Sequence, residues 1–279
     1  MEFKKLHGLG NDFIVVDCRE KPIQDPAAVS TKICDRHTGV GADGLIMVTQ
    51  SEKADLGMRI FNSDGSEAEM CGNGIRCYAK YVFEEGITNR TEFTVDTLAG
   101  IMQPRLILSG DGCVEAVVVD MGQPSINPGD IPVNTDRESF LEERLSIDGR
   151  EITASTIGMG VPHTVLYVDA FDGEDYIRRI GKAVENHPVF PCKTNVNFVR
   201  IIDRRNIEVR TWERGAGRTL ACGTGCCSAV VVSSLLNKTD RVVDVTLALG
   251  RLKVEWKDDG RVFMTGPAEN VCRGIWLKS

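Results

Sequence analysis

Two stretches of this chain carry the same short motif, and their likeness constrains the fold more than any other feature. Residues 58–74, MRIFNSDGSEAEMCGNG, align with residues 209–225, VRTWERGAGRTLACGTG, at a shift of 151 positions, the separation of Cys71 and Cys222. The strand-like run NDFIVVD then falls on PHTVLYVD, so an extended segment precedes each motif at a comparable distance. Such self-similarity predicts two similar halves. Coincidence between two β-rich stretches is the alternative, and the shared C-G-x-G core argues against it.

Short β-type runs bounded by Gly, Pro, Asn or Asp occur along the whole chain and predict strands. These runs cover residues 12–17, 56–61, 92–97, 113–120, 163–169, 196–202, 207–212, 241–249 and 251–256. Three segments predict helices: Gly72 to Glu85, Glu174 to Asn186 and Gly223 to Asn237. The sequence therefore predicts an α+β protein in which strands far outnumber helices.

A Pro-, Gly- and Asn-rich stretch at residues 121–137 is the expected boundary between the two halves. Residues 1–120 then form the N-terminal half, and a C-terminal strand at 268–279 can return to it. Residues 121–267 form the C-terminal half.

The composition of the chain limits the kinds of partner and the cellular compartment that we expect. A net charge of −7 gives no general attraction to nucleic acid or anionic lipid, so a small molecule is the expected partner. We find neither a secretory signal nor an apolar run long enough to span a membrane, which favours the cytoplasm. The 10 cysteines are then expected to be reduced thiols rather than a disulfide framework. A homodimer is an assembly that the sequence allows.

The C-G-x-G core places each cysteine at or just before a helix N-terminus. The first N–H groups of a helix lack intrahelical partners and carry partial positive charge, so they favour a thiolate and bind a carboxylate. Two such sites are expected to face each other across a cleft between the domains. This arrangement suits inversion of a stereocentre, which needs a base on one face of Cα and an acid on the other, with donors holding the carboxylate.

Other uses of the cysteines fit the spacing less well. Structural zinc sites favour C-x₂₋₄-C pairs with further Cys or His ligands, and thioredoxin-like chemistry uses C-x-x-C. The sequence has C-x₅-C and C-x₃-C-C on glycine-rich helix starts instead. We expect Cys77, Cys226 and Cys227, which lie further into the helices, to be buried packing residues.

The chain resembles the diaminopimelate epimerase family. This family belongs to the cofactor-independent amino-acid racemase group, which includes proline racemase. The resemblance runs nearly end to end and rests on seven motifs in order. They are HGLGNDFIVVD (7–17), DRHTGVGADGLI (35–46), NSDGSEAEMCGNGIRC (62–77), PHTV (162–165), NVNF (195–198), ERGAGRTLACGTG (213–225) and GPAE (266–269).

The resemblance implies two similar barrel-like domains, each wrapped round a central helix, with the active site in the cleft between them. It also implies the roles of individual residues. The implied catalytic residues are Cys71 and Cys222 as paired base and acid, with Glu213 and His163 beside them. The implied substrate-binding residues are Asn11, Asn62, Gly72, Asn73, Asn195, Glu213, Arg214, Gly223 and Thr224.

The implied activity is interconversion of LL- and meso-diaminopimelate without pyridoxal phosphate, another cofactor or a metal, in lysine and cell-wall precursor synthesis. This chain departs from the family pattern at two positions that bear on the substrate. Many family members have Asn at the position of Val161 and Gln at the position of Gly44. An epimerase of the same two-cysteine type acting on another amino acid is therefore one alternative. A non-catalytic ligand- or zinc-binding protein on the same scaffold is an alternative from another class.

Overall fold

The computed structural model describes residues 1–277 and divides into two compact units. Unit 1 consists of Met1–Asp120 and the chain from Thr265 onward, and unit 2 is Met121–Met264. The sequence analysis placed the C-terminal half at residues 121–267 and returned residues 268–279 to the N-terminal half. Residues 278 and 279 of the predicted C-terminal strand lie outside the described residues.

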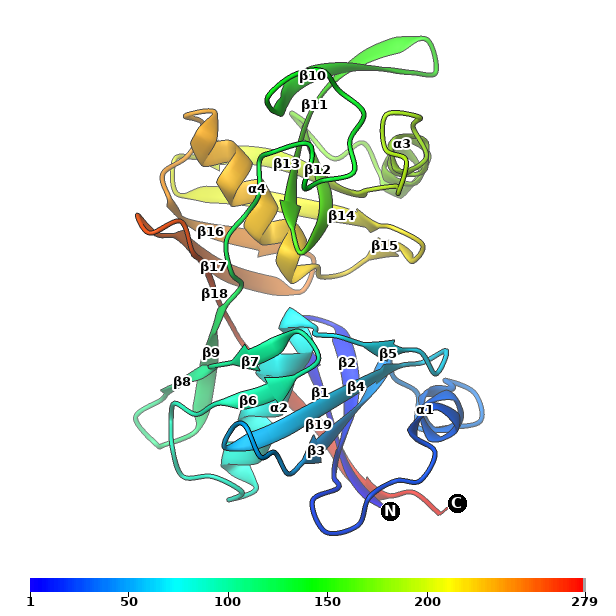
Figure 1. Ribbon diagram of the computed structural model, residues 1–279, viewed down its shortest axis with the longest axis vertical. Coiled ribbons are helices and arrows are strands. Elements are labelled where there is room, and N and C mark those ends of the chain that lie inside the picture. Colours follow the sequence, from blue (N-terminus) through cyan, green and yellow to red (C-terminus); the bar gives the residue numbers. More distant parts are fainter. Residues whose placement is uncertain (278–279) are drawn as a thin grey trace. The chain divides into compact units, whose positions relative to one another are not determined.

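Unit 1 is built on a sheet with strand order β19-β1-β2-β3-β4-β6-β7, in which β5 pairs with β4 (Figure 1). Strands β8 and β9 form an antiparallel hairpin in the same unit. The bounds are β1 (Glu2–Gly8), β2 (Asn11–Asp17), α1 (Pro26–Cys34), β3 (Gly44–Thr49), β4 (Leu56–Asn62), β5 (Glu67–Ala68), α2 (Gly72–Glu84), β6 (Val95–Thr97), β7 (Gly100–Met102), β8 (Arg105–Leu108), β9 (Val114–Asp120) and β19 (Glu269–Ile275).

Unit 2 has the strand order β10-β11-β12-β13-β14-β16-β17-β18, with β15 on β14. The bounds are β10 (Phe140–Ile147), β11 (Arg150–Met159), β12 (Val161–Tyr167), α3 (Glu174–Glu185), β13 (Asn195–Asp203), β14 (Asn206–Glu213), β15 (Gly217–Thr219), α4 (Gly223–Leu235), β16 (Val242–Leu247), β17 (Gly250–Trp256) and β18 (Val262–Gly266).

The two units repeat one topology. Each sheet has a parallel pair, β2 with β3 in unit 1 and β12 with β13 in unit 2, and a second one, β4 with β6 and β14 with β16. Helices α2 and α4 both have 13 residues, and each follows the short strand that pairs with β4 or β14. The predicted α+β class, with two similar β-rich halves, is confirmed.

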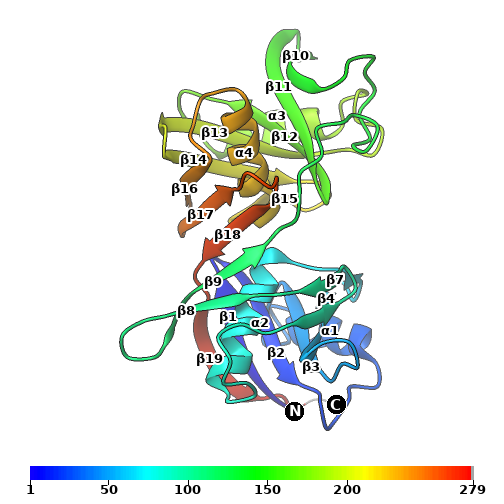
Figure 2. The same cartoon turned by 60° about the vertical axis from the view of Figure 1, so that its left-hand side comes forward.

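Helices α2 and α4 are the central helices of their units. In α2 every residue from Gly72 to Val82 is buried, and in α4 the run from Gly225 to Ser233 is buried without a break. Helix α2 packs against β1, β2 and β9, and α4 packs against β11, β12, β13 and β17 (Figure 2). A helix that is apolar on all sides, like the VVV run of α4, is stable only inside such a wrapping sheet.

The sequence analysis missed helix α1. Its signals are local: Asp25 accepts a hydrogen bond from the Ala28 N–H as N-cap, and Pro26 occupies the first turn. The short 9-residue helix lies between strand signals, which hid its weak periodicity. The other three helices start at the predicted residues and end one or two residues early. Among residues 1–277, none of the helices is long and apolar enough to cross a membrane.

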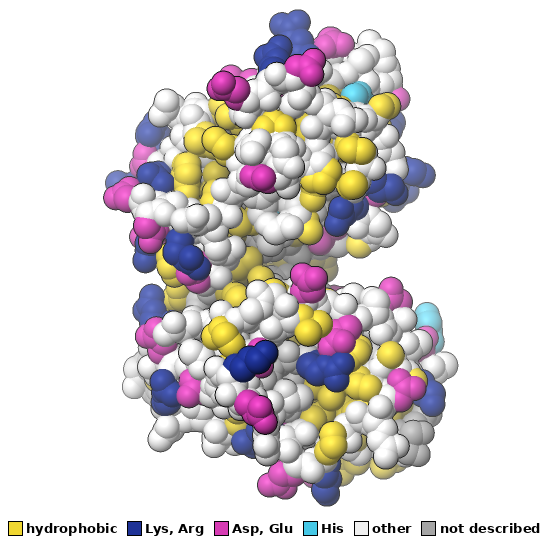
Figure 3. All heavy atoms as spheres, in the orientation of Figure 1, with side chains coloured by type: hydrophobic (Ala, Val, Ile, Leu, Met, Phe, Trp, Pro, Cys, Tyr) yellow, Lys and Arg dark blue, Asp and Glu magenta, His cyan; other side chains and the backbone are white. Residues whose placement is uncertain are grey.

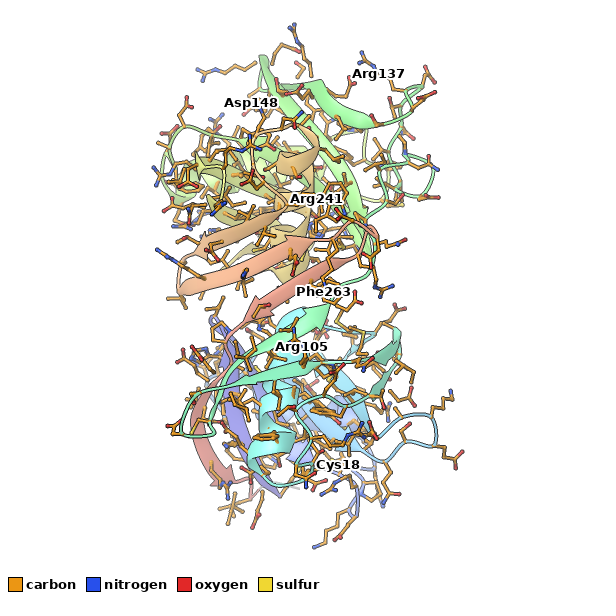
Figure 4. The ribbon with its side chains drawn as sticks, turned by 90° about the vertical axis from the view of Figure 1, so that its left-hand side faces the viewer. Cys18, Arg105, Arg137, Asp148, Arg241 and Phe263 are labelled. Carbon is orange, nitrogen blue, oxygen red and sulfur yellow. The ribbon has the colours of Figure 1, made fainter. Side chains whose placement is uncertain are left out.

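Charges of both signs are mixed on the surface, and one arginine holds a turn of unit 2. On the face drawn in Figure 3, Lys and Arg side chains lie interspersed with Asp and Glu. In unit 2, Arg241, labelled in Figure 4, stacks on the Trp256 ring at 4.1 Å and donates from Nε to the Trp256 carbonyl at 2.9 Å. A second nitrogen donates to the Lys257 carbonyl, so this side chain fastens the turn that follows β17.

Candidate active site

Cys71 is the N-cap of α2 and the centre of a polar cluster in unit 1. Its backbone is extended (φ −141°, ψ 121°), and its Sγ accepts the Gly74 N–H at 3.4 Å. Its thiol donates to Asn11 Oδ1 at 3.7 Å, and Asn73 Nδ2 donates to the same oxygen at 3.1 Å. The structure thus brings together three residues predicted from the sequence, Cys71, Asn11 and Asn73, at one helix start.

A charged network holds Asn11 in place. The Asn11 amide donates to Asp43 Oδ2 at 2.7 Å, and Arg36 bridges Asp43 and Asp12 at 2.8 and 2.7 Å. Lys5 adds a second cation 2.8 Å from Asp12. Partial burial opposes ionisation of Asp12, but the hydrogen bonds from Arg36 and Lys5 outweigh it and hold the pKa below its usual value. The sequence analysis missed this role of Arg36 and Asp43, although both lie in the DRHTGVGADGLI motif.

Two further unit 1 positions have defined surroundings. Asn62 ends β4, is exposed, and donates from Nδ2 to Ser66 Oγ at 2.9 Å. Gly44 begins β3, and a Cβ built there would stand 2.8 Å from the Phe61 carbonyl oxygen. A longer side chain at position 44 therefore requires a shift of the β3 or β4 backbone in this chain.

Cys222 is the N-cap of α4, also with an extended backbone (φ −127°, ψ 108°), but its surroundings differ from those of Cys71. The side chain is buried, and its Sγ lies 3.5 Å from Thr224 Oγ1. Burial raises the pKa of the Cys222 thiol well above its usual value, and the negative charge of Glu213 raises it further. The lower pKa expected from the helix N-terminus is therefore wrong for Cys222 in this structure, because desolvation exceeds the helix effect.

Asn195 and Arg214 meet beside the end of β14. Asn195 Oδ1 accepts the Arg214 backbone N–H at 2.8 Å, and Asn195 Nδ2 donates to the Pro162 carbonyl at 3.1 Å. The Arg214 guanidinium donates to the Cys192 carbonyl at 2.9 Å. Because Glu213 directly precedes Arg214, the hydrogen bond to the Arg214 N–H also holds the backbone of Glu213 in place.

His163 is fully buried on β12. Burial lowers the pKa of its imidazole to about 3, with the charge of Arg214 as a second cause, so the ring is neutral near pH 7. Its Nδ1 lies 3.2 Å from the Nδ2 atom of Asn197, a residue that the sequence analysis did not single out. The signal was present, since Asn197 is the second Asn of the NVNF motif.

Val161 begins β12 as Asn11 begins β2, so it takes the place in unit 2 that Asn11 has in unit 1. Its side chain is 36% exposed. The amide that accompanies Cys71 thus has an apolar counterpart in unit 2. Within residues 1–277, no group of three or more His, Cys, Asp or Glu side chains is arranged to hold a metal ion.

Several solved structures share the fold of this chain at low sequence identity. A Bacillus anthracis phenazine biosynthesis protein of the PhzF family matches with a TM-score of 0.74 at 17% identity, covering 100% of this chain and 99% of that one. A probable proline racemase from Agrobacterium radiobacter matches with a TM-score of 0.67 at 17% identity, covering 99% and 93%. The fold is therefore that of the PhzF and proline racemase proteins.

Sequence comparison then gives the family. The family model for diaminopimelate epimerase matches residues 3–127 and 155–271. The diaminopimelate epimerases of Caldanaerobacter subterraneus and Acetivibrio thermocellus are each 49% identical, over 274 and 275 residues, and each match covers 98% of both chains. The chain belongs to the diaminopimelate epimerase family, and it is an epimerase, an enzyme of the isomerase class. The resemblance stated from the seven motifs is confirmed.

Proposed function

We propose that this enzyme interconverts LL- and meso-diaminopimelate by proton transfer at Cα between two thiols, those of Cys71 and Cys222. One observation carries the proposal: each of these cysteines is the N-cap of a 13-residue central helix at the same place in two topologically equivalent units. Membership of the diaminopimelate epimerase family supports the substrate.

The reaction involves proton transfer only, and no atom changes its oxidation state. A thiolate removes the Cα proton and becomes a thiol, the Cα–H electron pair moves into the carboxylate to give an enolate-like species, and the other thiol returns a proton to the opposite face. The backbone N–H groups at the two helix starts, those of Gly72, Asn73, Gly223 and Thr224, point away from intrahelical partners and are suited to hold the carboxylate as its charge grows. The reverse reaction exchanges the roles of the two sulfur atoms.

The two thiols start from different states in this proposal. Burial and Glu213 keep Cys222 protonated near neutral pH, so Cys222 is the proton donor of the resting enzyme. Cys71 is less buried, and it must lose the proton of its hydrogen bond to Asn11 Oδ1 before it acts as the base. The neutral His163 and the negatively charged Glu213 act beside Cys222, His163 through its hydrogen bonds and Glu213 through its charge.

The far end of the substrate carries a second carboxylate and a second ammonium. We assign the carboxylate to Arg214, Asn195 and Asn62, and the ammonium to Glu213 with nearby backbone carbonyls. A guanidinium suits a carboxylate because it donates two parallel hydrogen bonds. Since Val161 removes one amide from unit 2, an epimerase for another amino acid is the second candidate.

Proton exchange at Cα tests both candidates. Purified enzyme in heavy water, without added pyridoxal phosphate or metal, is expected to incorporate deuterium into diaminopimelate faster than into any other amino acid of a panel. Faster exchange in another amino acid would establish the second candidate. Loss of activity on chelation, restored by zinc, would contradict the two-thiol mechanism and support the zinc-binding alternative.

Variants of the cysteines test the residues. Cys71→Ala and Cys222→Ala are each expected to abolish epimerisation, because each removes one proton carrier. Cys77→Ala and Cys227→Ala are matched controls, since both thiols are buried inside the same two helices. They are expected to keep activity. Full activity without Cys71 would contradict the assignment.

We also propose a cytoplasmic location and a role in lysine and cell-wall precursor synthesis.

A further inference from the structure

Asn197 is a buried amide that joins three strands of unit 2. It lies on β13 with no exposed surface. Its Nδ2 atom contacts His163 Nδ1 on β12 at 3.2 Å and the Thr164 carbonyl at 3.4 Å. Its Oδ1 atom accepts the Thr211 hydroxyl of β14 at 3.1 Å. All the hydrogen-bonding atoms of this side chain therefore have partners in neighbouring strands.

These partners fix the orientation of the amide. A backbone carbonyl can only accept a hydrogen bond, so the atom that faces the Thr164 carbonyl must be the NH₂ group. The hydroxyl of Thr211 can donate to the oxygen on the other side. Turning the amide over would set two acceptors, Oδ1 and the Thr164 carbonyl, against each other. The NH₂ group thus also faces His163.

The orientation of Asn197 determines where His163 carries its proton. Because Asn197 Nδ2 donates, His163 Nδ1 must accept, and a neutral imidazole that accepts at Nδ1 has its proton on Nε2. The Nε2 atom is buried and has no hydrogen-bond partner within residues 1–277. A buried N–H donor without a partner costs free energy, so this donor favours an anionic acceptor brought to its half-site, the part of the proposed active site that unit 2 forms around Cys222.

The same amide lies against the helix start that carries Cys222. A Cβ built on Gly225 would stand 2.3 Å from Asn197 Oδ1 and 3.3 Å from Cys222 Sγ. The absence of a side chain at Gly225 therefore lets Asn197 approach the first turn of α4, next to the thiol. Asn197 therefore contacts His163 with its NH₂ group and lies with its oxygen beside the helix start that carries Cys222.

We propose that Asn197 is a positioning residue, which fixes His163 as the Nε2–H tautomer so that His163 serves its half-site as a hydrogen-bond donor and never as a base. This inference rests on the proposed function, in which the two thiols alone carry the transferred protons. A donor that cannot accept a proton stabilises negative charge in the half-site without competing for the proton of Cys222.

The tautomer can be measured without substrate, so the test is separate from that of the proposed function. The chain has 4 histidines, and ¹⁵N NMR of histidine-labelled enzyme distinguishes a protonated from an unprotonated ring nitrogen. A His163→Gln variant assigns the His163 signals. We expect wild-type His163 to be neutral and protonated on Nε2 at pH 7. A proton on Nδ1, or a doubly protonated ring, would overturn the proposal even in a fully active enzyme.

Asn197→Asp tests the role of Asn197 itself. A carboxylate only accepts hydrogen bonds, so it should draw the proton of His163 to Nδ1, and kcat should fall at least tenfold with less change in KM. Thr211→Val is the matched control, because it removes the hydrogen bond on the other side of the amide and should leave the proton on Nε2. An unchanged tautomer in Asn197→Asp, or a reversed tautomer with unchanged kcat, would refute the positioning role. The wild-type spectrum decides the tautomer if the variant does not fold.

Discussion

Gly225 and Gly74 hold the same place in the two units, as the third residue of α4 and of α2, yet replacement by alanine should affect them differently. At Gly225 the new Cβ would stand 2.3 Å from Asn197 Oδ1. At Gly74 it would meet the Ile60 and Ile46 methyl groups at 3.1 and 3.4 Å and the Cys71 Cβ at 3.3 Å. Methyl ends of isoleucine can yield by a few tenths of an ångström, whereas the Asn197 amide is held on both sides.

The expected cost of Gly225→Ala follows from those contacts. Nonbonded atoms favour separations of about 3.5 Å, so the amide must retreat by roughly 1 Å. This movement breaks its bonds to His163, Thr164 and Thr211, each worth about 1 kcal/mol. Alanine returns at most about 1 kcal/mol through its better helix propensity. The net loss is about 2 kcal/mol, or roughly 4–8 °C in Tm.

Urea and thermal unfolding of wild type, Gly225→Ala and Gly74→Ala measure this difference directly. We expect Gly74→Ala to stay within about 0.5 kcal/mol of wild type. A Gly225→Ala enzyme as stable as wild type would refute the close contact with Asn197. Equal losses in both variants would show that the cost arises from helix starts in general and not from the amide.

Three further results are expected. Asp43→Ala should lower kcat several-fold by releasing Asn11, and Asp43→Asn, which can still accept the Asn11 amide, should retain more activity in the same assay. Arg36→Gln should cost on the order of 1 kcal/mol at pH 7, because the lowered pKa of Asp12 gives stability above its unfolded pKa that is lost as pH falls through the folded pKa. The difference from wild type should therefore shrink in unfolding curves as the pH falls below 3.8, the ordinary pKa of Asp12, and through its lowered folded-state pKa. Cys77→Ala should lose about 1–2 kcal/mol of unfolding free energy with its kcat unchanged, and a large fall in kcat would show that this buried thiol takes part in the reaction.

Sequence patterns were sufficient for the class of fold and for the repeat. The C-G-x-G cores mark α2 and α4 because glycine beside a helix start and an apolar run after it are local signals. Helix α1 was not predicted, because the only local signals of its 9 residues are an N-cap and a proline in the first turn. Short strands such as β5, with 2 residues, form through pairing with a neighbour and have no pattern of their own.

The residues of the candidate site could be predicted where they lie within a motif, and less well where distant segments meet. Cys71, Asn73 and Cys222 follow from the helix starts themselves. The Arg36, Asp43 and Asn11 network depends on the pairing of β2 with β3, which no local pattern specifies. The raised pKa of Cys222 was also out of reach, because the depth of burial is a property of packing and not of the spacing around a cysteine.

The return of the C-terminal segment to unit 1 sets an order for folding during synthesis. Unit 2 is continuous in sequence, whereas unit 1 needs β19, which pairs with β1 over Glu2 to His7. Arg76 of α2 also donates to the carbonyl of Pro267. The ribosome thus makes the first half early but completes it last, so the helix that carries Cys71 gains this anchor only after residue 267 has left the exit tunnel, when unit 2 has all its residues.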